Sequence, residues 1–342
     1  MVNKLYLVTP RGFCAGVEMA IKALYWLLKI YDEKIYCYHE IVHNKWIVKE
    51  FENKNVIFVE DPNDIPDGAI VMLSAHGTAP DIEEKFNKKS SLSINSVCPL
   101  VTKVHHEAKK FSQENYQIIY VGHKGHDEAI GAMGVAPENM HLVESVEDLN
   151  NLEVSDNVAL LAQTTLAISE WEPIMELAQS KYNNLKMPRK SDLCYATTNR
   201  QHAVLEILPK VETVLVVGSE NSSNTKALVN MVINKNKKAF RIENLEDVEN
   251  LELTGNIAIT AGASAPDHIV FEIIEKINPN SLENFLLIEE SEYFPLPIQL
   301  RKNVQNISNF LSKFNNTGKY PESLHGINND KSWSATEALS SL

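Results

Sequence analysis

The sequence predicts an α/β protein built from three diverged copies of one unit. Three of its four cysteines, Cys14, Cys98 and Cys194, each stand directly before a run of apolar residues at helical spacing. Each such helix pattern leads into a short apolar strand and a polar loop. The strand ends 25 positions after the cysteine in every copy, at a polar residue: His39, His123 and Ser219. The shared order and offset indicate a repeat.

Each copy continues with a second apolar strand and a second polar loop. These strands are the runs AIVMLSAHG, VALLAQTT and IAITAGASAP. Short apolar strands between helices favour mostly parallel sheets. Ligands of such sheets bind beyond the carboxyl ends of the strands. If the three copies face one another, three cysteines and six polar loops converge on one centre.

The repeat predicts three domains, residues 1–97, 98–193 and 194–285, followed by a C-terminal segment, residues 286–342. From about Lys302 onward the composition is polar and rich in Gly, Pro, Asn and Ser. We therefore expect a disordered or loosely attached tail. The run NVQNISNFLSKF at the start of this segment predicts one short amphipathic helix.

The negative charge of the chain disfavours some classes of binding partner. A formal net charge of −13 and a pI near 5.4 argue against nucleic acid and against anionic membranes. No signal peptide pattern and no run of 18 apolar residues is visible, so we expect a cytoplasmic protein. Any bound anion must be held locally, by polar side chains, backbone N–H groups or helix N-termini.

The repeated cysteines are candidate metal or cluster ligands. A thiolate directly before a helix faces the positive end of the helix dipole, which lowers its pKa and favours metal binding. Three thiolates, one from each copy, can ligate three irons of a cubane and leave the fourth iron open. From spacing alone, a buried free cysteine remains the alternative at each position. Cys37 lies inside a strand and off the repeat, so we interpret it as a small buried hydrophobe.

A loop rich in Ser and Asn is a candidate phosphate site. The run GSENSSNTKAL places Ser222, Ser223 and Asn224 directly before a helix that begins near Thr225. Small hydroxyl and amide side chains at a helix N-terminus suit a phosphate. Ordinary turns and helix caps use the same residues, which is the alternative.

Histidines stand at the ends of other strands. His43, His76 and His126 lie in such loops, and imidazoles can donate hydrogen bonds to phosphate oxygens. A lone histidine is more often structural, but three of them in loops at strand ends favour a role in binding.

Glu128 and a pair of threonines are candidates for the chemistry. Glu128 lies two residues beyond His126, where a carboxyl can relay protons to a bound hydroxyl. The alternative is an acid in the first turn of a helix, stabilised by the dipole. Thr164 and Thr165 end another strand, and the alternative for them is a helix N-cap.

Nine segments in the same order resemble the 4-hydroxy-3-methylbut-2-enyl diphosphate reductase family of the non-mevalonate isoprenoid pathway. They run from Pro10 to Asp267, with weaker similarity to about Asn303. The segments are PRGFCAGV, HEIVHN, SAHG, CPLVTKVH, GHKGH, AQTTL, DLCYATTNRQ, GSENSSN and TAGASAPD.

The resemblance implies a trefoil of three α/β domains around a central [4Fe–4S] cluster, with Cys14, Cys98 and Cys194 as ligands. It implies that Glu128 and Thr164 serve the substrate hydroxyl and its protonation, with Thr165 beside them. It also implies a set of side chains that bind the diphosphate: His43, His76, His126, Ser222, Ser223, Asn224 and Ser264.

The implied reaction is the reductive dehydroxylation of (E)-4-hydroxy-3-methylbut-2-enyl diphosphate at the open iron of the cluster. It consumes two electrons and two protons, expels water, and yields isopentenyl diphosphate and dimethylallyl diphosphate. In this family the electrons come from a ferredoxin or a flavodoxin.

Two other classes of protein fit the sequence less well. A zinc hydrolase is disfavoured because no CxxC or HExxH spacing is present. A non-catalytic iron–sulfur redox sensor would leave the Ser/Asn loop and Glu128 without a role. A bound nicotinamide is not expected, because no GxGxxG fingerprint is visible.

Overall fold

A computed structural model describes residues 1–154, 157–314, 327 and 329–342. The chain forms two compact units. The first unit comprises Met1–Cys14 and Leu100–Ser291, and the second comprises Ala15–Pro99 and Glu292–Leu342. All named strand pairs in the described residues are parallel, which confirms the predicted class of sheet.

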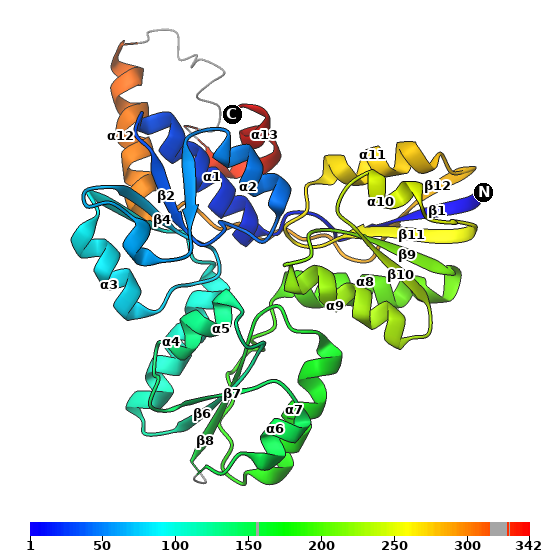
Figure 1. The fold of residues 1–342 in the computed structure, drawn as a ribbon, viewed down its shortest axis with the longest axis horizontal. Coiled ribbons are helices and arrows are strands. Elements are labelled where there is room, and N and C mark those ends of the chain that lie inside the picture. The colour runs from blue at the N-terminus through cyan, green and yellow to red at the C-terminus, as the bar shows by residue number, and fades with distance from the viewer. Residues whose placement is uncertain (155–156, 315–326, 328) are drawn as a thin grey trace. The chain divides into compact units, whose positions relative to one another are not determined.

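The first unit contains a five-stranded sheet in the order β10-β9-β11-β1-β12. Its strands are β1 (Val2–Thr9), β9 (Thr213–Val217), β10 (Lys238–Ile242), β11 (Gly255–Ala261) and β12 (Ser281–Leu286). Its helices are α8 (Tyr195–Ile207), η2 (Leu208–Lys210), α9 (Ser223–Asn234), α10 (Glu246–Glu249) and α11 (Asp267–Ile277). Helices α8 and α9 cover one face of the sheet, and α11 covers the other (Figure 1).

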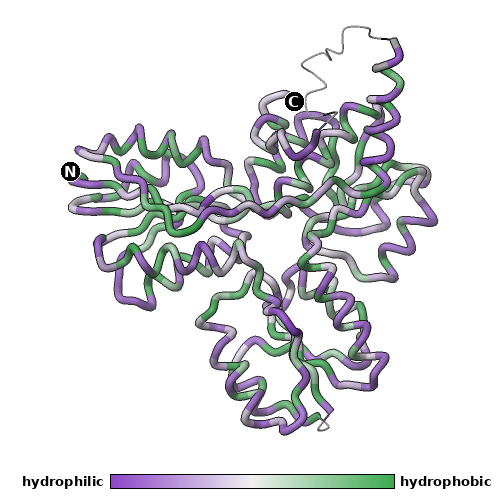
Figure 2. Tube along the Cα trace, turned by 180° about the vertical axis from the view of Figure 1, so that it is seen from behind, coloured by the Kyte–Doolittle hydropathy of each residue, from purple (hydrophilic) through white to green (hydrophobic). Residues whose placement is uncertain are grey.

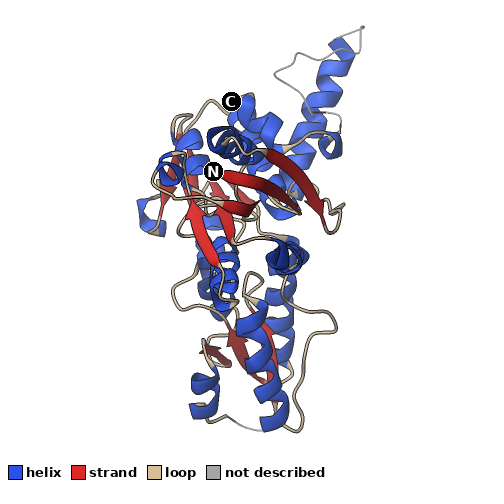
Figure 3. Ribbon diagram, turned by 90° about the vertical axis from the view of Figure 1, so that its right-hand side faces the viewer, coloured by secondary structure: helices blue, strands red, loops and turns tan. Residues whose placement is uncertain are grey.

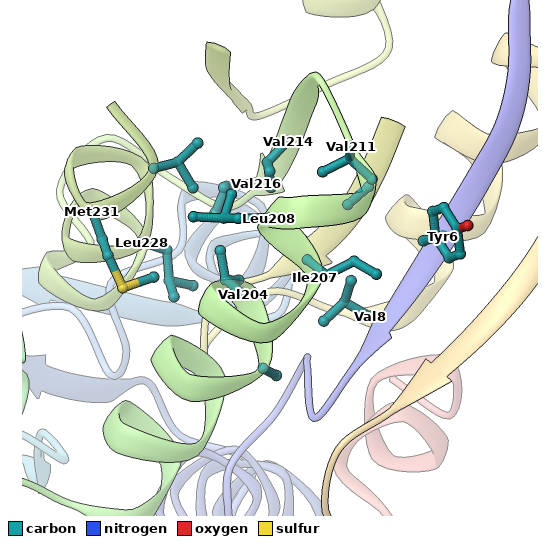
Figure 4. Packing of buried hydrophobic residues seen from close by; sticks show 13 residues of the cluster. Tyr6, Val8, Val204, Ile207, Leu208, Val211, Val214, Val216, Leu228 and Met231 are labelled. Atoms are coloured by element: carbon teal, nitrogen blue, oxygen red, sulfur yellow. The ribbon is translucent and has the colours of Figure 1, made fainter. Parts of the chain in front are cut away.

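Side chains alternate between the two faces along each strand, and in this sheet the apolar ones on both faces are covered by helices. Val214 and Val216 point toward α8 and α9, where they pack with Val204 and Leu228 in one apolar core (Figure 4). Leu215, which lies between them, is buried on the opposite face. The inner strands are accordingly hydrophobic along their length, whereas the covering helices alternate between hydrophobic and hydrophilic (Figure 2).

Strand β1 does not belong to the domain that the repeat predicts for it. Residues 1–97 are expected from the repeat to form one domain, yet β1 pairs with β11 and β12 of the last third. The run KLYLV predicts a buried strand but carries no signal of its partner, which is chosen by packing with residues far along the chain. Residues Val2–Thr9 therefore belong with the sheet of residues 213–286.

The first unit also holds a three-stranded sheet in the order β7-β6-β8. Its strands are β6 (Gln117–Val121), β7 (Met140–Val143) and β8 (Val158–Ala162). Its helices are α4 (Pro99–Gln113), α5 (Asp127–Met133), α6 (Val146–Asn151) and α7 (Ile168–Lys181). Helices α4 and α5 pack on one face, and α6 and α7 pack on the other (Figures 1 and 3).

The second unit contains a four-stranded sheet in the order β3-β2-β4-β5. Its strands are β2 (Ile35–Tyr38), β3 (Val56–Val59), β4 (Ile70–Leu73) and β5 (Leu92–Asn95). Its remaining elements up to residue 95 are α1 (Ala15–Ile30), α2 (Lys45–Glu52), η1 (Pro62–Asp64) and α3 (Pro80–Lys89). Apart from β1, the three sheets therefore follow the three predicted thirds in sequence order, and we keep the remaining boundaries as a proposal.

The end of the chain is the main difference from the expected loose tail. After α12 (Ile298–Phe314), residues 315–326 and 328 of that predicted tail lie outside the described residues. The elements η4 (Asp330–Ser332) and α13 (Ala335–Ser340) then pack on α1. Trp333 is 3% exposed, and its ring centroid lies 4.9 Å from that of Tyr25. Average composition missed this anchor because a single buried tryptophan can hold a polar segment.

Lys22 of α1 completes the attachment. Its ammonium is buried, donates to the carbonyl oxygens of Asp330 and Trp333, and lies 3.3 Å from the Asp330 carboxylate. Ser334 and Glu337 form a capping box at the start of α13. In the part of the chain that the structure describes, no helix has both the length and the apolar character that crossing a bilayer requires.

Candidate active site

Each repeated cysteine is held by the same backbone contact. The N–H of Cys98 donates to the carbonyl of Ala75 (3.0 Å), and that of Cys194 donates to Thr164 (3.0 Å). The N–H of Cys14 donates to Ala263 (3.1 Å). Each acceptor follows the second strand of the preceding copy, and for Cys14 the preceding copy is the last one. Within its own unit, each cysteine is thus anchored to a strand end of another copy, which the sequence pattern did not reveal.

Cys14 and Cys194 lie near one another in the first unit. Cys194 is the N-cap of α8, and its sulfur accepts a hydrogen bond from the backbone N–H of Thr197 (3.3 Å). Burial raises the pKa of the Cys194 thiol to about 11, and repulsion from the Cys14 thiolate contributes to this rise. The expected lowering by the helix N-terminus is therefore wrong for the chain by itself, because desolvation outweighs the Thr197 hydrogen bonds. A thiol of high proton affinity with a second thiol beside it fits a soft cation, which replaces the proton of Cys194.

Glu128 lies beside this sulfur pair. It is 2% exposed, and burial raises its pKa to about 7. Its Oε1 accepts from the backbone N–H of Thr164 (2.7 Å), and its Oε2 accepts from the Thr164 hydroxyl (3.1 Å). It is also near enough to Cys194 for the two charges to repel. The structure therefore places the buried Glu128 and Thr164 beside the half-buried Cys194.

Residues next to Glu128 fix its loop. His126 is the N-cap of α5, and its Nδ1 accepts from the N–H of Glu128 (3.2 Å). Gln163 is fully buried, accepts from the backbone N–H of His123 (3.0 Å), and donates to the Thr165 hydroxyl (2.8 Å). Sequence reasoning gave Gln163 no role of its own. The sequence feature that could have indicated its role is its place at the end of a strand, directly before Thr164 and Thr165.

The Ser/Asn loop caps α9 and reaches toward Cys194. The Ser222 hydroxyl accepts from the N–H of Thr225 (3.3 Å), so Ser222 is the N-cap and Ser223 begins the helix. Asn224 is buried, accepts from the N–H of Ala263 (3.0 Å), and donates to the Thr197 hydroxyl (3.3 Å). Ser264, next to Ala263, is also buried.

Two glycines permit the close approach of α9. A Cβ at Gly218 would lie 2.3 Å from the Thr225 hydroxyl oxygen, and one at Gly262 would lie 2.2 Å from it. A side chain at either strand end would therefore clash with Thr225 in the first turn of α9. These glycines stand in the quoted motifs, but their role is visible only in the packing.

His43, His76 and Cys98 lie in the second unit. The imidazoles of His43 and His76 are stacked, with ring centroids 3.8 Å apart and an interplanar angle of 12°. Cys37 is fully buried in β2, and burial raises its pKa. That Cys37 is not a ligand stays a prediction.

Comparisons with known proteins agree with one family. The family described as LytB protein matches residues 5–278. The 4-hydroxy-3-methylbut-2-enyl diphosphate reductase of Cutibacterium acnes is 41% identical over 88% of this chain and 95% of that protein. The reductase of the same name from Streptomyces coelicolor is 40% identical, over 89% of this chain and 92% of its own.

Solved structures give the same result. The E-1-hydroxy-2-methyl-but-2-enyl-4-diphosphate reductase of Plasmodium falciparum matches with a TM-score of 0.85 at 35% identity, over 90% of this chain and 99% of that one. A structure of (E)-4-hydroxy-3-methyl-but-2-enyl diphosphate reductase matches with a TM-score of 0.58 at 29% identity, over 81% of this chain and 99% of that one. The expected fold class is confirmed by this likeness. From the extent of the match and the identity to its relatives, the chain belongs to the LytB protein family.

Proposed function

We propose that this chain catalyses the reductive dehydroxylation of (E)-4-hydroxy-3-methylbut-2-enyl diphosphate to isopentenyl diphosphate and dimethylallyl diphosphate. The reaction takes up two electrons and two protons, breaks the allylic C–O bond, and releases the hydroxyl oxygen as water. The names of the relatives support this substrate. The observation that carries the proposal is the buried Glu128 carboxyl beside Cys194, because loss of a hydroxyl as water requires a proton donor effective near neutral pH.

Cys14, Cys98 and Cys194 would hold a [4Fe–4S] cluster. Thiolate sulfur is the usual ligand of such clusters, and the three cysteines share one backbone anchor. When bound, the cluster supplies electrons one at a time and an iron with an open coordination position. A cation bound by the neighbouring Cys14 and Cys194 sulfurs displaces the proton of Cys194, which matches this donor set.

Glu128 and Thr164 would deliver the proton to the leaving hydroxyl. The Thr164 N–H holds Oε1 of Glu128 in place, and this leaves Oε2 to share a proton with the Thr164 hydroxyl. A protonated Glu128 passes its proton to Thr164 while the Thr164 proton moves to the departing oxygen. A pKa of about 7 keeps both forms of Glu128 populated at neutral pH.

The diphosphate would be bound by helix ends, hydroxyls and imidazoles. A chain with a net charge of −13 needs local groups to attract this anion. The N-terminus of α9 offers backbone N–H groups and the positive end of a dipole. The side chains proposed to contact the substrate are His43, His76, His126, Thr164, Thr165, Ser222, Ser223, Asn224 and Ser264.

The electron donor would be a one-electron carrier protein such as a ferredoxin or a flavodoxin. A cytoplasmic location suits the cysteines, because the structure describes all four as thiols outside any disulfide and reducing compartments preserve thiols. Neither nucleic acid nor a membrane is proposed as a partner.

The test is an anaerobic assay of the full-length protein after cluster reconstitution, with the allylic diphosphate and a reduced one-electron donor. We expect both products from the wild type. Glu128→Gln should keep the cluster and substrate binding but lose at least about 100-fold in turnover, since general acid catalysis contributes that much. A chain that binds the cluster and substrate without forming product would refute the proposal and favour the redox sensor.

A further inference from the structure

Arg200 is a fully buried cation in α8, the helix that begins at Cys194. Its exposed fraction is 0%. Its Nη1 donates to both carboxylate oxygens of Glu290 (2.9 and 3.1 Å) and to the Ala196 carbonyl (2.9 Å). Its Nη2 donates to the carbonyl of Gly12 (2.8 Å). The guanidinium thus joins three segments of the first unit: α8, the loop before Cys14 and the segment after β12.

The Gly12 contact bears directly on Cys14. Gly12 lies two residues before that cysteine and adopts φ +72°, a left-handed conformation that glycine allows. The Arg11 guanidinium, paired with Asp267 (3.1 Å), and the N–H of Cys14, bonded to Ala263, tie this loop to α11 and to the end of β11. Arg200 ties it to α8, whose N-cap is Cys194.

Glu290 compensates the buried charge of Arg200 and also ties the segment after β12 to α8. Its side chain is 15% exposed and also accepts from the Asn199 amide (3.2 Å). The chain leaves the first unit directly after Cys14 and again directly after Ser291. The Arg200–Glu290 pair therefore fixes both of these exits to the same turn of α8.

A buried ion pair is a poor device for stability alone, because desolvation offsets most of the attraction and apolar residues of similar volume serve as well. Its advantage is directional: the guanidinium fork holds its partners at fixed angles, and a lysine does not. We propose that Arg200 is a positioning residue that sets the separation of the Cys14 and Cys194 sulfurs by clamping the loop before Cys14 to the helix that begins at Cys194. This inference deepens the proposed cofactor site and rests on it.

The experiment measures the spacing of the two thiols without the cluster. Full-length protein carrying Cys37→Ser and Cys98→Ser retains only the Cys14 and Cys194 thiols. Phenylarsine oxide, which bridges two neighbouring thiols, is titrated into this reduced, cluster-free protein under anaerobic conditions. The test variants are Arg200→Lys, which keeps the charge and loses the fork, and Glu290→Gln, which keeps the shape and loses the charge. The control is Val204→Ala, which loosens the same helix on its apolar face.

We expect Arg200→Lys to weaken arsenical binding by about tenfold, the equivalent of one charge-assisted hydrogen bond. Glu290→Gln should weaken it less, and Val204→Ala should stay within about twofold even where its melting temperature falls as far. In the loaded protein with its native cysteines, a chelator should remove iron faster from Arg200→Lys than from Val204→Ala.

Two results would overturn the inference. One is equal arsenical affinity in Arg200→Lys and Val204→Ala at matched loss of melting temperature, which would make Arg200 an ordinary structural residue. If Arg200→Lys does not fold, as judged by far-UV circular dichroism, the decision passes to Glu290→Gln, and an affinity equal to that of the wild type refutes the clamp. Neither result depends on turnover, so failure of the proposed reaction is a separate outcome.

Discussion

Replacing Glu128 by glutamine should make the cluster-free protein more stable at high pH. The carboxyl titrates near 4.5 when exposed and near 7 when folded, because burial disfavours its charged form. Below pH 4.5 both states hold the proton and the group is neutral toward folding. As pH rises from 4.5 through 7 the unfolded state loses its proton first, so the wild type loses stability. Above pH 7 the whole difference, ~3 kcal/mol, is lost.

The glutamine of the variant would remain neutral throughout, and its carbonyl oxygen would still accept from the Thr164 N–H. We therefore expect Glu128→Gln to match the wild type near pH 4 and to exceed it by ~3 kcal/mol at pH 8.5. Urea unfolding of both proteins across this range gives the difference, in which the titration of other groups cancels. A difference that stays flat through pH 7, or a wild type that is the more stable protein at pH 8.5, would refute the reasoning.

Glu170→Gln is a control for which the expected change in stability has the opposite sign; Glu170 lies in α7, which packs on the same three-stranded sheet as α5. The hydrogen bond with His123 lowers the pKa of Glu170, and two further backbone and charge contributions act in the same direction against burial. The Glu170 carboxylate stabilises the folded protein at any pH above the pKa that it has in the unfolded chain. This stabilisation is lost as the pH falls through its pKa in the folded protein. Glu170→Gln should therefore be less stable than the wild type at pH 7, while Glu128→Gln is more stable.

Three further outcomes are expected. Serine in place of Cys14, Cys98 or Cys194 should abolish the cluster absorbance after reconstitution, whereas Cys37→Ser should retain it; equal loss in the Cys37 variant would contradict the ligand assignment. Gly218→Ala should weaken substrate binding by about tenfold with the cluster intact, because the added Cβ clashes with Thr225 in the first turn of α9; unchanged affinity in calorimetry would remove that role. Trp333→Ala should lower the free energy of unfolding by about 3–5 kcal/mol, and a change under about 0.5 kcal/mol would show that the C-terminal contact is weak.

Periodicity predicted the elements of this fold well where burial dictates them. The second strands of the three copies are continuous apolar runs, as parallel strands covered on both faces must be, and they match β4, β8 and β11. The polar residues after them fall at strand ends because the hydrophobic run stops where burial stops. The candidate residues of the first unit accordingly lie in loops or at helix starts.

Features that depend on residues distant in sequence were not predictable. Nothing near Val2–Thr9 specifies β11 and β12 as partners, and nothing near Arg200 announces Gly12 or Glu290. The raised pKa of Cys194 illustrates the same limit, because the helix start is visible in sequence while the depth of burial is not. The local sequence pattern identifies candidate side chains, whereas their partners and their burial are visible only in the folded structure.

The pairing of β1 with β11 and β12 has a consequence for biosynthesis. Strand β1 is synthesised well before its partners, which begin at Gly255 and Ser281. At typical elongation rates this interval is on the order of ten seconds or more. Cys14, whose N–H is bonded to Ala263, cannot adopt its final place earlier. The loop that carries this thiol is therefore completed late in synthesis, when the end of β11 is available to anchor it.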